Sequence, residues 1–249
     1  MLLSETMMVW LPVVTAPFVG SFLGVLIRDL PAERPLLRAR SRCEACGTVL
    51  GVEDLVPVVS YVAARGRCRH CRAAIGAFYI AIELAALFVA ACVAATAFDP
   101  ADVWAGCVLS WTLLALAWID AEHLYLPDVL TLPLVLAGLA ATWWLDPDAL
   151  FDHAVAAALG YVGLRLIGAV YARLRGREGL GQGDAKLLAG SGAWLGVAAL
   201  AWVLLVSAVI GIGVALVMAI REPDIGRREI PFGPPLALAT WLIWLLSYS

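Results

Sequence analysis

Residues 181–220 read GQGDAKLLAGSGAWLGVAALAWVLLVSAVIGIGVALVMAI, an apolar run whose charged side chains are Asp184 and Lys186 alone. Runs of this length and hydropathy are typical of helices that cross a membrane, where backbone groups must find their hydrogen-bond partners within the helix. The whole chain has this character, since 63% of its 249 residues are hydrophobic and only 15% are charged. A soluble domain of this size could not bury so much apolar surface, so the sequence predicts a polytopic membrane protein.

Apolar runs predict about eight transmembrane helices and therefore an all-α fold. The sixth and seventh share the run quoted above, and we expect their boundary near Gly196 to Leu200. The main polar insertion is expected to be a cytoplasmic zinc-ribbon-like loop at 29–76, between a first transmembrane helix at 1–28 and a seven-helix membrane domain at 77–249. No internal repeat is evident. The predicted spans are 8–27, 77–98, 103–119, 126–145, 153–172, 185–199, 201–220 and 234–248.

The distribution of cations predicts the orientation of these spans. Nine of the seventeen Lys and Arg residues lie between Arg28 and Arg72, whereas the connections Phe98 to Asp102 and Asp146 to Asp152 carry carboxylates and no cation. With eight spans, every cationic connection falls on the same side of the membrane. The positive-inside rule makes that side cytoplasmic.

Two Cys-x-x-Cys pairs separated by 21 residues lie in the polar insertion. This spacing is typical of a four-thiolate zinc site, and a loop of about 48 residues is too small for a stable core of its own. Four sulfurs close the coordination sphere, so the predicted zinc is structural. A redox-active pair is the alternative, although disulfides are disfavoured on the cytosolic side. The predicted ligands are Cys43, Cys46, Cys68 and Cys71.

Two aspartates lie at span ends on the predicted cytoplasmic side. Asp120 ends the third predicted span, and Asp184 opens the sixth after a glycine-rich approach. Ionisable groups at membrane depth are costly and usually functional. Two carboxyl groups that share a site can act as an aspartyl protease does, one as the base that activates water and the other as the acid.

Four neighbouring residues are candidates for a supporting role. Gly181 and Gly183 lack Cβ atoms and would let a substrate backbone or a partner helix approach closely. Lys186 would act on a nearby carboxylate or anchor the helix at the interface. Asp128 competes with Asp120 for the catalytic role, but it follows Pro127 at a predicted helix start, where aspartate is useful structurally.

Several segments together resemble the bacterial prepilin peptidases, which are GxGD-type intramembrane aspartyl proteases. Members of that family act as leader peptidases and N-methyltransferases in type IV pilus and type II secretion systems. The resemblance runs nearly from end to end. It is carried by GSFLGVLIRDLP at 20–31, the two cysteine pairs, Ile119-Asp120 with Leu126-Pro127-Asp128, GQGDAKL at 181–187 and IPFGP at 230–234.

The resemblance implies that Asp120 and Asp184 form a catalytic dyad. It also implies a bacterial inner-membrane enzyme that faces the cytoplasm and removes short basic leaders from prepilin and pseudopilin precursors. The new N-terminal residue would then be methylated with S-adenosylmethionine as donor, for which the sequence offers no recognisable binding residues. The expected partners are these precursors and the lipid bilayer, and no nucleic acid is expected.

The chain departs from the family pattern at three positions in its amino-terminal third. Gly24 stands where the family usually has asparagine, and Glu44 and Ile80 stand where it usually has proline. The family links this third to methyl transfer, so a peptidase without methyl transfer stays open as an alternative. A membrane thiol oxidoreductase is the alternative from another enzyme class, and a transporter with carboxylates in its ion path is the non-enzymatic one.

Overall fold

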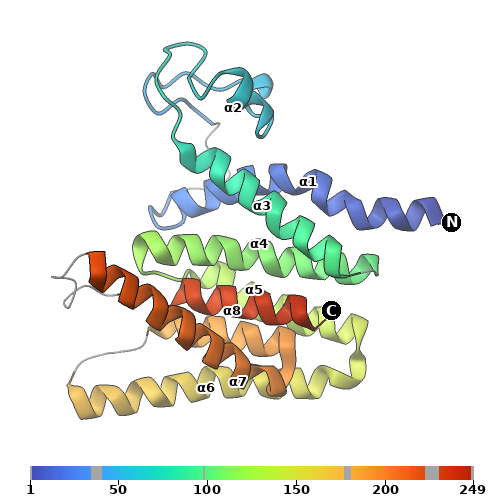
Figure 1. The fold of residues 1–249 in the computed structure, drawn as a ribbon, viewed down its shortest axis with the longest axis vertical. Helices are drawn as coiled ribbons and strands as arrows, with labels where there is room; N and C mark the ends of the chain where they lie inside the picture. Colours follow the sequence, from blue (N-terminus) through green and yellow to red (C-terminus); the bar gives the residue numbers. More distant parts are fainter. Residues whose placement is uncertain (1, 35–40, 98, 177–180, 222–229, 248–249) are drawn as a thin grey trace. The chain divides into compact units, whose positions relative to one another are not determined.

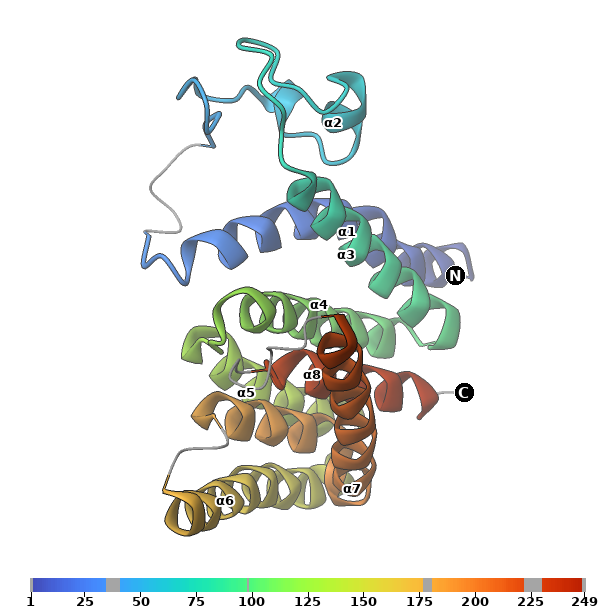
Figure 2. The same cartoon turned by 60° about the vertical axis from the view of Figure 1, so that its left-hand side comes forward.

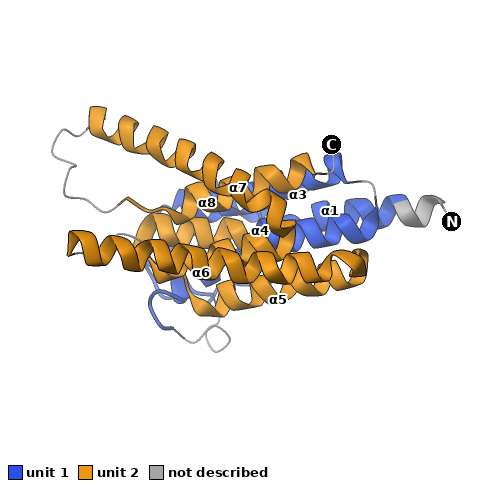
Figure 3. Ribbon diagram, turned by 90° about the horizontal axis from the view of Figure 1, so that it is seen from below, with its two compact units in different colours: residues 1–111 blue, residues 112–249 orange. Residues whose placement is uncertain are grey.

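The computed structural model describes residues 2–34, 41–97, 99–176, 181–221 and 230–247. The regular structure of these residues is helical, and apart from two isolated bridges they contain no β-structure. The predicted all-α fold is therefore confirmed. The chain divides into two compact units, Met1–Trp111 and Thr112–Ser249, which Figure 3 shows in different colours. This division falls inside a helix, whereas the predicted boundaries after residues 28 and 76 concern membrane topology and stay a prediction.

In the first unit, α1 (Leu2–Asp29) packs along α3 (Ala77–Thr96), as Figure 1 shows. Gly20 allows this close approach, because a Cβ atom there would lie 2.6 Å from the Cα of Glu83. Helices in membranes commonly meet at small residues in this way. The Trp111 indole, on the part of α4 (Pro100–His123) that belongs to this unit, donates to the Ala86 carbonyl at 3.1 Å. In the sequence, two short helices follow α1 and precede α3. They are η1 (Val52–Asp54) and α2 (Val59–Ala63).

The described part of the second unit contains the end of α4 and the helices α5 to α8 (Figure 2). The helices α6 and α7 approach each other closely at glycines. A Cβ at Gly192 would lie 2.5 Å from the backbone of Ala156, and one at Gly160 would lie 2.8 Å from the Leu188 carbonyl oxygen. The elements are α5 (Asp128–Leu145), η2 (Pro147–Ala149), α6 (Leu150–Arg175), α7 (Gln182–Arg221) and α8 (Gly233–Leu246).

The helix α7 is interrupted at Gly196, where the backbone has φ 76° and ψ 178°. This conformation is essentially restricted to glycine. The chain changes direction sharply there (Figure 1), so α7 consists of an N-terminal half, residues 182–195, and a C-terminal half, residues 197–221. An unbroken helix of 40 residues would be about 60 Å long, twice the thickness of a hydrocarbon core. The break lies where the boundary between the sixth and seventh spans was predicted.

Among the residues that the structure describes, six helices are long and apolar enough to cross a membrane, namely α1, α3, α4, α5, α6 and α7. The apolar α8 is shorter, with 14 residues. Since α7 contains two of the predicted spans, these seven helices hold all eight predicted apolar segments. The chain is a multi-pass membrane protein.

Candidate active site and metal centre

A cavity of about 960 Å³ lies in the second unit. The end of α4, the start of α5, both halves of α7 and the segment that precedes α8 contribute to its wall. Asp120 and Asp184, which are 64 residues apart in the sequence, both line it. The other residues along its wall are Leu124, Tyr125, Leu126, Asp128, Gly181, Gln182, Gly183, Lys186, Ala208, Gly211, Ile212, Ala215, Ile230, Pro231 and Phe232.

Asp120 lies in the last turn of α4 and is 6% exposed. Its Oδ2 accepts a hydrogen bond of 2.8 Å from the backbone N–H of Gly233, the first residue of α8. The free N–H groups at a helix start favour a carboxylate in this position. A Cβ at residue 233 would lie 2.6 Å from the same oxygen, so the contact requires glycine. The IPFGP segment therefore holds Asp120 in place.

Asp184 is the third residue of α7 and is 9% exposed. The backbone N–H of Gly181 donates to its carboxyl group, which also interacts electrostatically with Asp120. Gly183 serves close packing between protein segments, because a Cβ there would lie 2.7 Å from the Leu126 Cβ. Gly183 thus fits the start of α7 against the α4–α5 connection, whereas a Cβ at Gly181 would lie 3.1 Å from Asp184 Oδ2.

Asp128 and Lys186 form an ion pair in the wall of the same cavity. Their side chains are 59% and 22% exposed, whereas Asp120 and Asp184 are buried. Asp128 is the first residue of α5 and follows Pro127, which is the helix-start position expected for it. The pair accounts for both of these residues structurally and leaves the two buried carboxyl groups for acid–base chemistry.

The four cysteines predicted as metal ligands come together in the first unit. Their Sγ atoms all lie within 4.8 Å of one another, and those of Cys43 and Cys71 are 3.8 Å apart. A tetrahedron with zinc–sulfur bonds of about 2.3 Å has edges of roughly 3.8 Å. Four soft thiolates at this spacing fit a zinc ion that has no open coordination position. The arrangement brings all four sulfurs to one point, unlike two separate redox pairs.

The pKa values of the cysteine thiols are shifted in different directions. Hydrogen bonds from the side chain and backbone of Thr48 lower the pKa of Cys46 to about 6. Backbone N–H groups of Cys71 and His70 lower the pKa of Cys68. At Cys71 a backbone hydrogen bond from Ala73 lowers the pKa of the thiol. Desolvation and the neighbouring thiols outweigh this effect and raise the pKa to about 11. Four crowded thiolates need a cation between them.

The two cysteine pairs are built as a short structural repeat that the sequence analysis missed. In each, the residue after the second cysteine donates to the first cysteine's carbonyl at 2.9 Å and has positive φ: Gly47 at 70° and Arg72 at 62°. Isolated bridges close both turns, Arg42 with Val49 and Arg67 with Ala74. Every equivalent pair of residue numbers differs by 25. In the sequence this repeat is indicated by the pattern Arg-Cys-x-x-Cys, which occurs at 42–46 and again at 67–71.

This repeat predicts different effects of alanine at its two equivalent positive-φ residues. Gly47→Ala should destabilise the metal-loaded loop by about 1 kcal/mol, because L residues are disfavoured at positive φ. No atom lies within 4 Å of the position of the new Cβ, so the effect is confined to the backbone. Arg72→Ala is the matched control, since residue 72 already has a Cβ. Zinc-chelator competition measures both variants, and equal zinc retention by the two would contradict the prediction.

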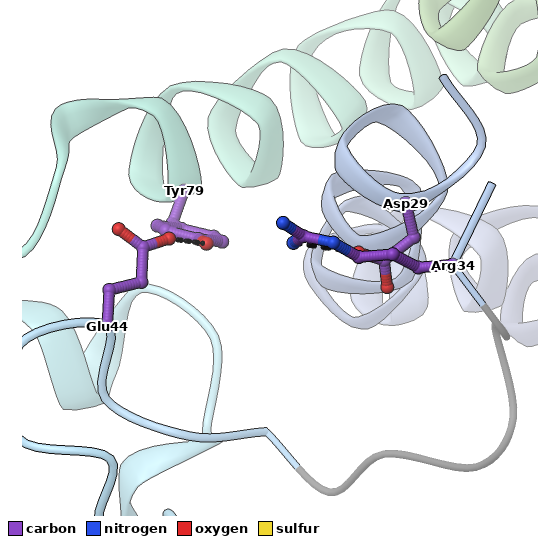
Figure 4. Close-up of polar contacts among 4 residues, drawn as sticks. All are labelled: Asp29, Arg34, Glu44 and Tyr79. Carbon is purple, nitrogen blue, oxygen red and sulfur yellow. Dashed lines mark hydrogen bonds and ion pairs between the residues drawn. The ribbon is translucent and has the colours of Figure 1, made fainter. Parts of the chain in front are cut away.

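A hydrogen bond joins the cysteine-bearing segment to α3, and a local ion pair lies at the end of α1. The Tyr79 hydroxyl donates to Glu44 at 2.8 Å, and the Arg34 guanidinium lies 3.8 Å from the Asp29 carboxylate (Figure 4). A Cβ at Gly24 would lie 3.8 Å from the Tyr79 ring. Of the three departures from the family pattern, residues 24 and 44 therefore lie beside Tyr79, and Ile80 follows it in the sequence.

Glu83 is a buried carboxylate to which the sequence analysis gave no role. This residue of α3 is 8% exposed and accepts a hydrogen bond of 2.7 Å from the Val58 N–H at the start of α2. Val58 has φ 61°, which is a strained conformation for a β-branched residue. The buried carboxylate thus anchors a strained turn of the loop to the first unit's helices. The contact spans 25 residues, and no local pattern indicates it.

Known proteins resemble this chain along most of its length. The family model described as Bacterial Peptidase A24 N-terminal domain matches residues 14–97, and the one described as Type IV leader peptidase family matches residues 107–216. The prepilin leader peptidase/N-methyltransferase of Burkholderia pseudomallei (strain 1026b) is 45% identical over 209 residues, covering 84% of this chain and 68% of that protein. The chain belongs to the type IV leader peptidase family.

Further members of the type IV leader peptidase family match over more of their length. The prepilin leader peptidase/N-methyltransferases of Dichelobacter nodosus and Aeromonas hydrophila are 38% and 36% identical to this chain. They align with 87% and 91% of it and over 75% and 87% of their own length. No solved structure matches the chain. The N-terminal family model lies within the first unit, and the leader peptidase model includes both Asp120 and Asp184.

Proposed function

We propose that this chain is an aspartic endopeptidase that removes the leader peptide from type IV prepilins and type II secretion pseudopilins and then methylates the new N-terminal residue. The observation that carries the peptidase assignment is the pair of buried carboxyl groups, Asp120 and Asp184, in the wall of one cavity. Relatives with 36–45% identity bear both activities in their names.

The dyad acts by general acid–base catalysis. One carboxylate takes a proton from a water molecule, whose oxygen attacks the carbonyl carbon of the scissile bond. The other carboxyl group donates its proton to the carbonyl oxygen. When the tetrahedral intermediate collapses, the carbon–nitrogen bond breaks and the leaving amine takes up a proton from the dyad. Gly233 and Gly181 hold the two carboxyl groups through their backbone N–H groups.

Zinc held by Cys43, Cys46, Cys68 and Cys71 has a structural role in this proposal. Four thiolates leave no position for a bound water, so the ion stabilises the loop and takes no part in peptide hydrolysis. S-adenosylmethionine supplies the methyl group, and the new N-terminal amine accepts it.

The cavity faces the cytoplasm of a bacterial inner membrane in this proposal. Within the second unit, the helix ends that carry Asp120 and Asp184 lie on the same side as those that carry Arg175 and Arg221. The positive-inside rule assigns that side to the cytoplasm. A basic leader would lie along the anionic inner leaflet, with the scissile bond at the depth of the dyad.

Co-expression with a type IV prepilin and mass spectrometry of the product's N-terminus test the proposal. Cleaved product with the mass of one added methyl group is the expected result. Cleaved product without this increment would support the second candidate, a peptidase without methyl transfer, which the residues at positions 24, 44 and 80 favour. Uncleaved precursor, with the enzyme folded in the membrane, would overturn the peptidase assignment.

A further inference from the structure

The break in α7 separates backbone groups on the two sides of Gly196 from their helical partners, among them the Val197 N–H and the Ala193 carbonyl. In a continuous helix, the Val197 N–H would donate to the Ala193 carbonyl four residues earlier. Gly196 turns the chain away, so both groups need other partners. Backbone groups freed at a helix break are satisfied by side chains or by water.

Two adjacent residues at the start of α6 supply these partners. Asp152 accepts the Val197 N–H through Oδ2 at 2.9 Å. His153 Nδ1 lies 3.0 Å from the Ala193 carbonyl oxygen and donates to it in the tautomer that carries the ring hydrogen on Nδ1. The Thr142 hydroxyl of α5 donates to the same carbonyl oxygen at 3.4 Å and lies 3.0 Å from His153 Nδ1. Asp152 and His153 therefore replace, one on each side, the hydrogen bond that Gly196 breaks.

The space at the break is shaped for this contact. A Cβ at residue 196 would lie 2.5 Å from Asp152 Oδ2 and 3.2 Å from His153 Nε2. Two separate reasons therefore require glycine at residue 196. Its backbone angles are disfavoured for other residues, and a Cβ atom would come too close to the Asp152 and His153 side chains. The pair and the glycine form one unit, which we call the α7 latch: Asp152, His153 and Gly196.

The two halves of α7 are held to different degrees. The N-terminal half, which carries Asp184, is clamped by close contacts to α5 and α6, and its Trp194 donates to the Leu134 carbonyl at 2.9 Å. The C-terminal half has little burial, with Trp202 62% and Val209 63% exposed. Yet this half supplies one wall of the cavity, through Ala208, Gly211, Ile212 and Ala215. Val203 and Ser207 are its buried residues, and its path begins at the break.

We propose that Asp152 and His153 are positioning residues for precursor binding: by latching the break at Gly196 they set the direction of the C-terminal half of α7 and hence the cavity wall against which the substrate lies. This inference rests on the proposed peptidase function for its kinetic consequence. The latch itself is independent of that function. The pair touches neither Asp120 nor Asp184, so its loss changes the fit of the substrate more than the acid–base chemistry.

Amide hydrogen exchange at Val197 tests the latch directly, in nanodiscs and with the full chain. Asp152→Ala removes the acceptor and should speed exchange of this amide by about three- to tenfold, as expected for the loss of one hydrogen bond. Asp152→Asn keeps an acceptor oxygen and should restore slow exchange. Asp148→Ala, which removes an exposed carboxylate from the same connection, is the matched control. Equal exchange rates at Val197 in all these variants and the wild type would overturn the latch.

Steady-state cleavage of a prepilin tests the positioning role. His153→Phe and Asp152→Ala should raise KM by about three- to tenfold with kcat per folded enzyme nearly unchanged, whereas His153→Asn, which keeps an N–H donor, should stay close to wild type. A fall in kcat with KM unchanged would show a merely structural role and overturn the proposal. Should the wild type cleave no precursor, the proposed function fails, while the exchange rate at Val197 still decides the latch.

Discussion

Replacing Asp184 by asparagine should lower kcat/KM for precursor cleavage by about 10³-fold or more, and Asp120→Asn should do the same. General acid–base catalysis by a positioned group contributes about 10²- to 10⁴-fold, and an amide can neither take nor give the proton. Both carboxyl groups are buried in the wall of one cavity, whereas Asp128, the third carboxylate along that wall, is exposed and paired with Lys186. The asparagine at position 120 keeps an oxygen that accepts the Gly233 N–H, so the fold should persist.

Because the two groups act as one unit, the double variant should be no slower than either single variant. Asp128→Asn is the matched control, since Asp128 lines the same cavity but is exposed and paired with Lys186. It should lose less than about tenfold, in keeping with the small energies of exposed ion pairs. Initial rates on a purified prepilin, with circular dichroism as the check on folding, measure all four. A loss in Asp128→Asn as large as that in Asp120→Asn would remove Asp120 from the dyad.

The features that the sequence predicts well depend on local signals. Span length and hydropathy reveal the helices, since each helix in lipid satisfies its own backbone and needs no distant partner. The break in α7 was expected near Gly196 to Leu200 and occurs at Gly196, because glycine is needed for its φ of 76°. The four cysteines were expected at one point because paired Cys-x-x-Cys spacings have one common geometric use, and their sulfurs do meet.

The features that the sequence analysis missed depend on contacts between distant residues. Gly233 and Asp120 are 113 residues apart, and the IPFGP segment gives no sign that its glycine touches a carboxylate. Asp152 and His153 are separated from the break they hold by about 40 residues. Both contacts pair a side chain with a freed backbone group at a helix end. Such groups become visible only when the path of the chain is known.

Removing one sulfur from the metal centre should separate the two proposed activities. Cys68→Ala is expected to abolish zinc binding and methyl transfer, while leader cleavage stays within about tenfold of wild type. Among residues 41–76, which the structure describes throughout, Pro57 and Cys68 alone are buried, so the loop has no hydrophobic core to replace the metal. In zinc-finger peptides structural zinc contributes about 10–16 kcal/mol, which is far more than so small a loop gains from burial.

Cleavage should survive because the dyad and every residue along the cavity wall belong to the second unit, Thr112–Ser249, whereas the cysteines belong to the first. Zinc content by mass spectrometry and both activities on one prepilin are measured together. Cys92→Ala, which removes a single cysteine of α3 outside the four-sulfur cluster, is the matched control and should keep zinc and both activities. Loss of cleavage together with methyl transfer in Cys68→Ala would mean that the second unit needs the metal-stabilised loop to fold or to bind its substrate. Retained methyl transfer without zinc would show instead that the proposed link between the cysteine loop and that activity is wrong.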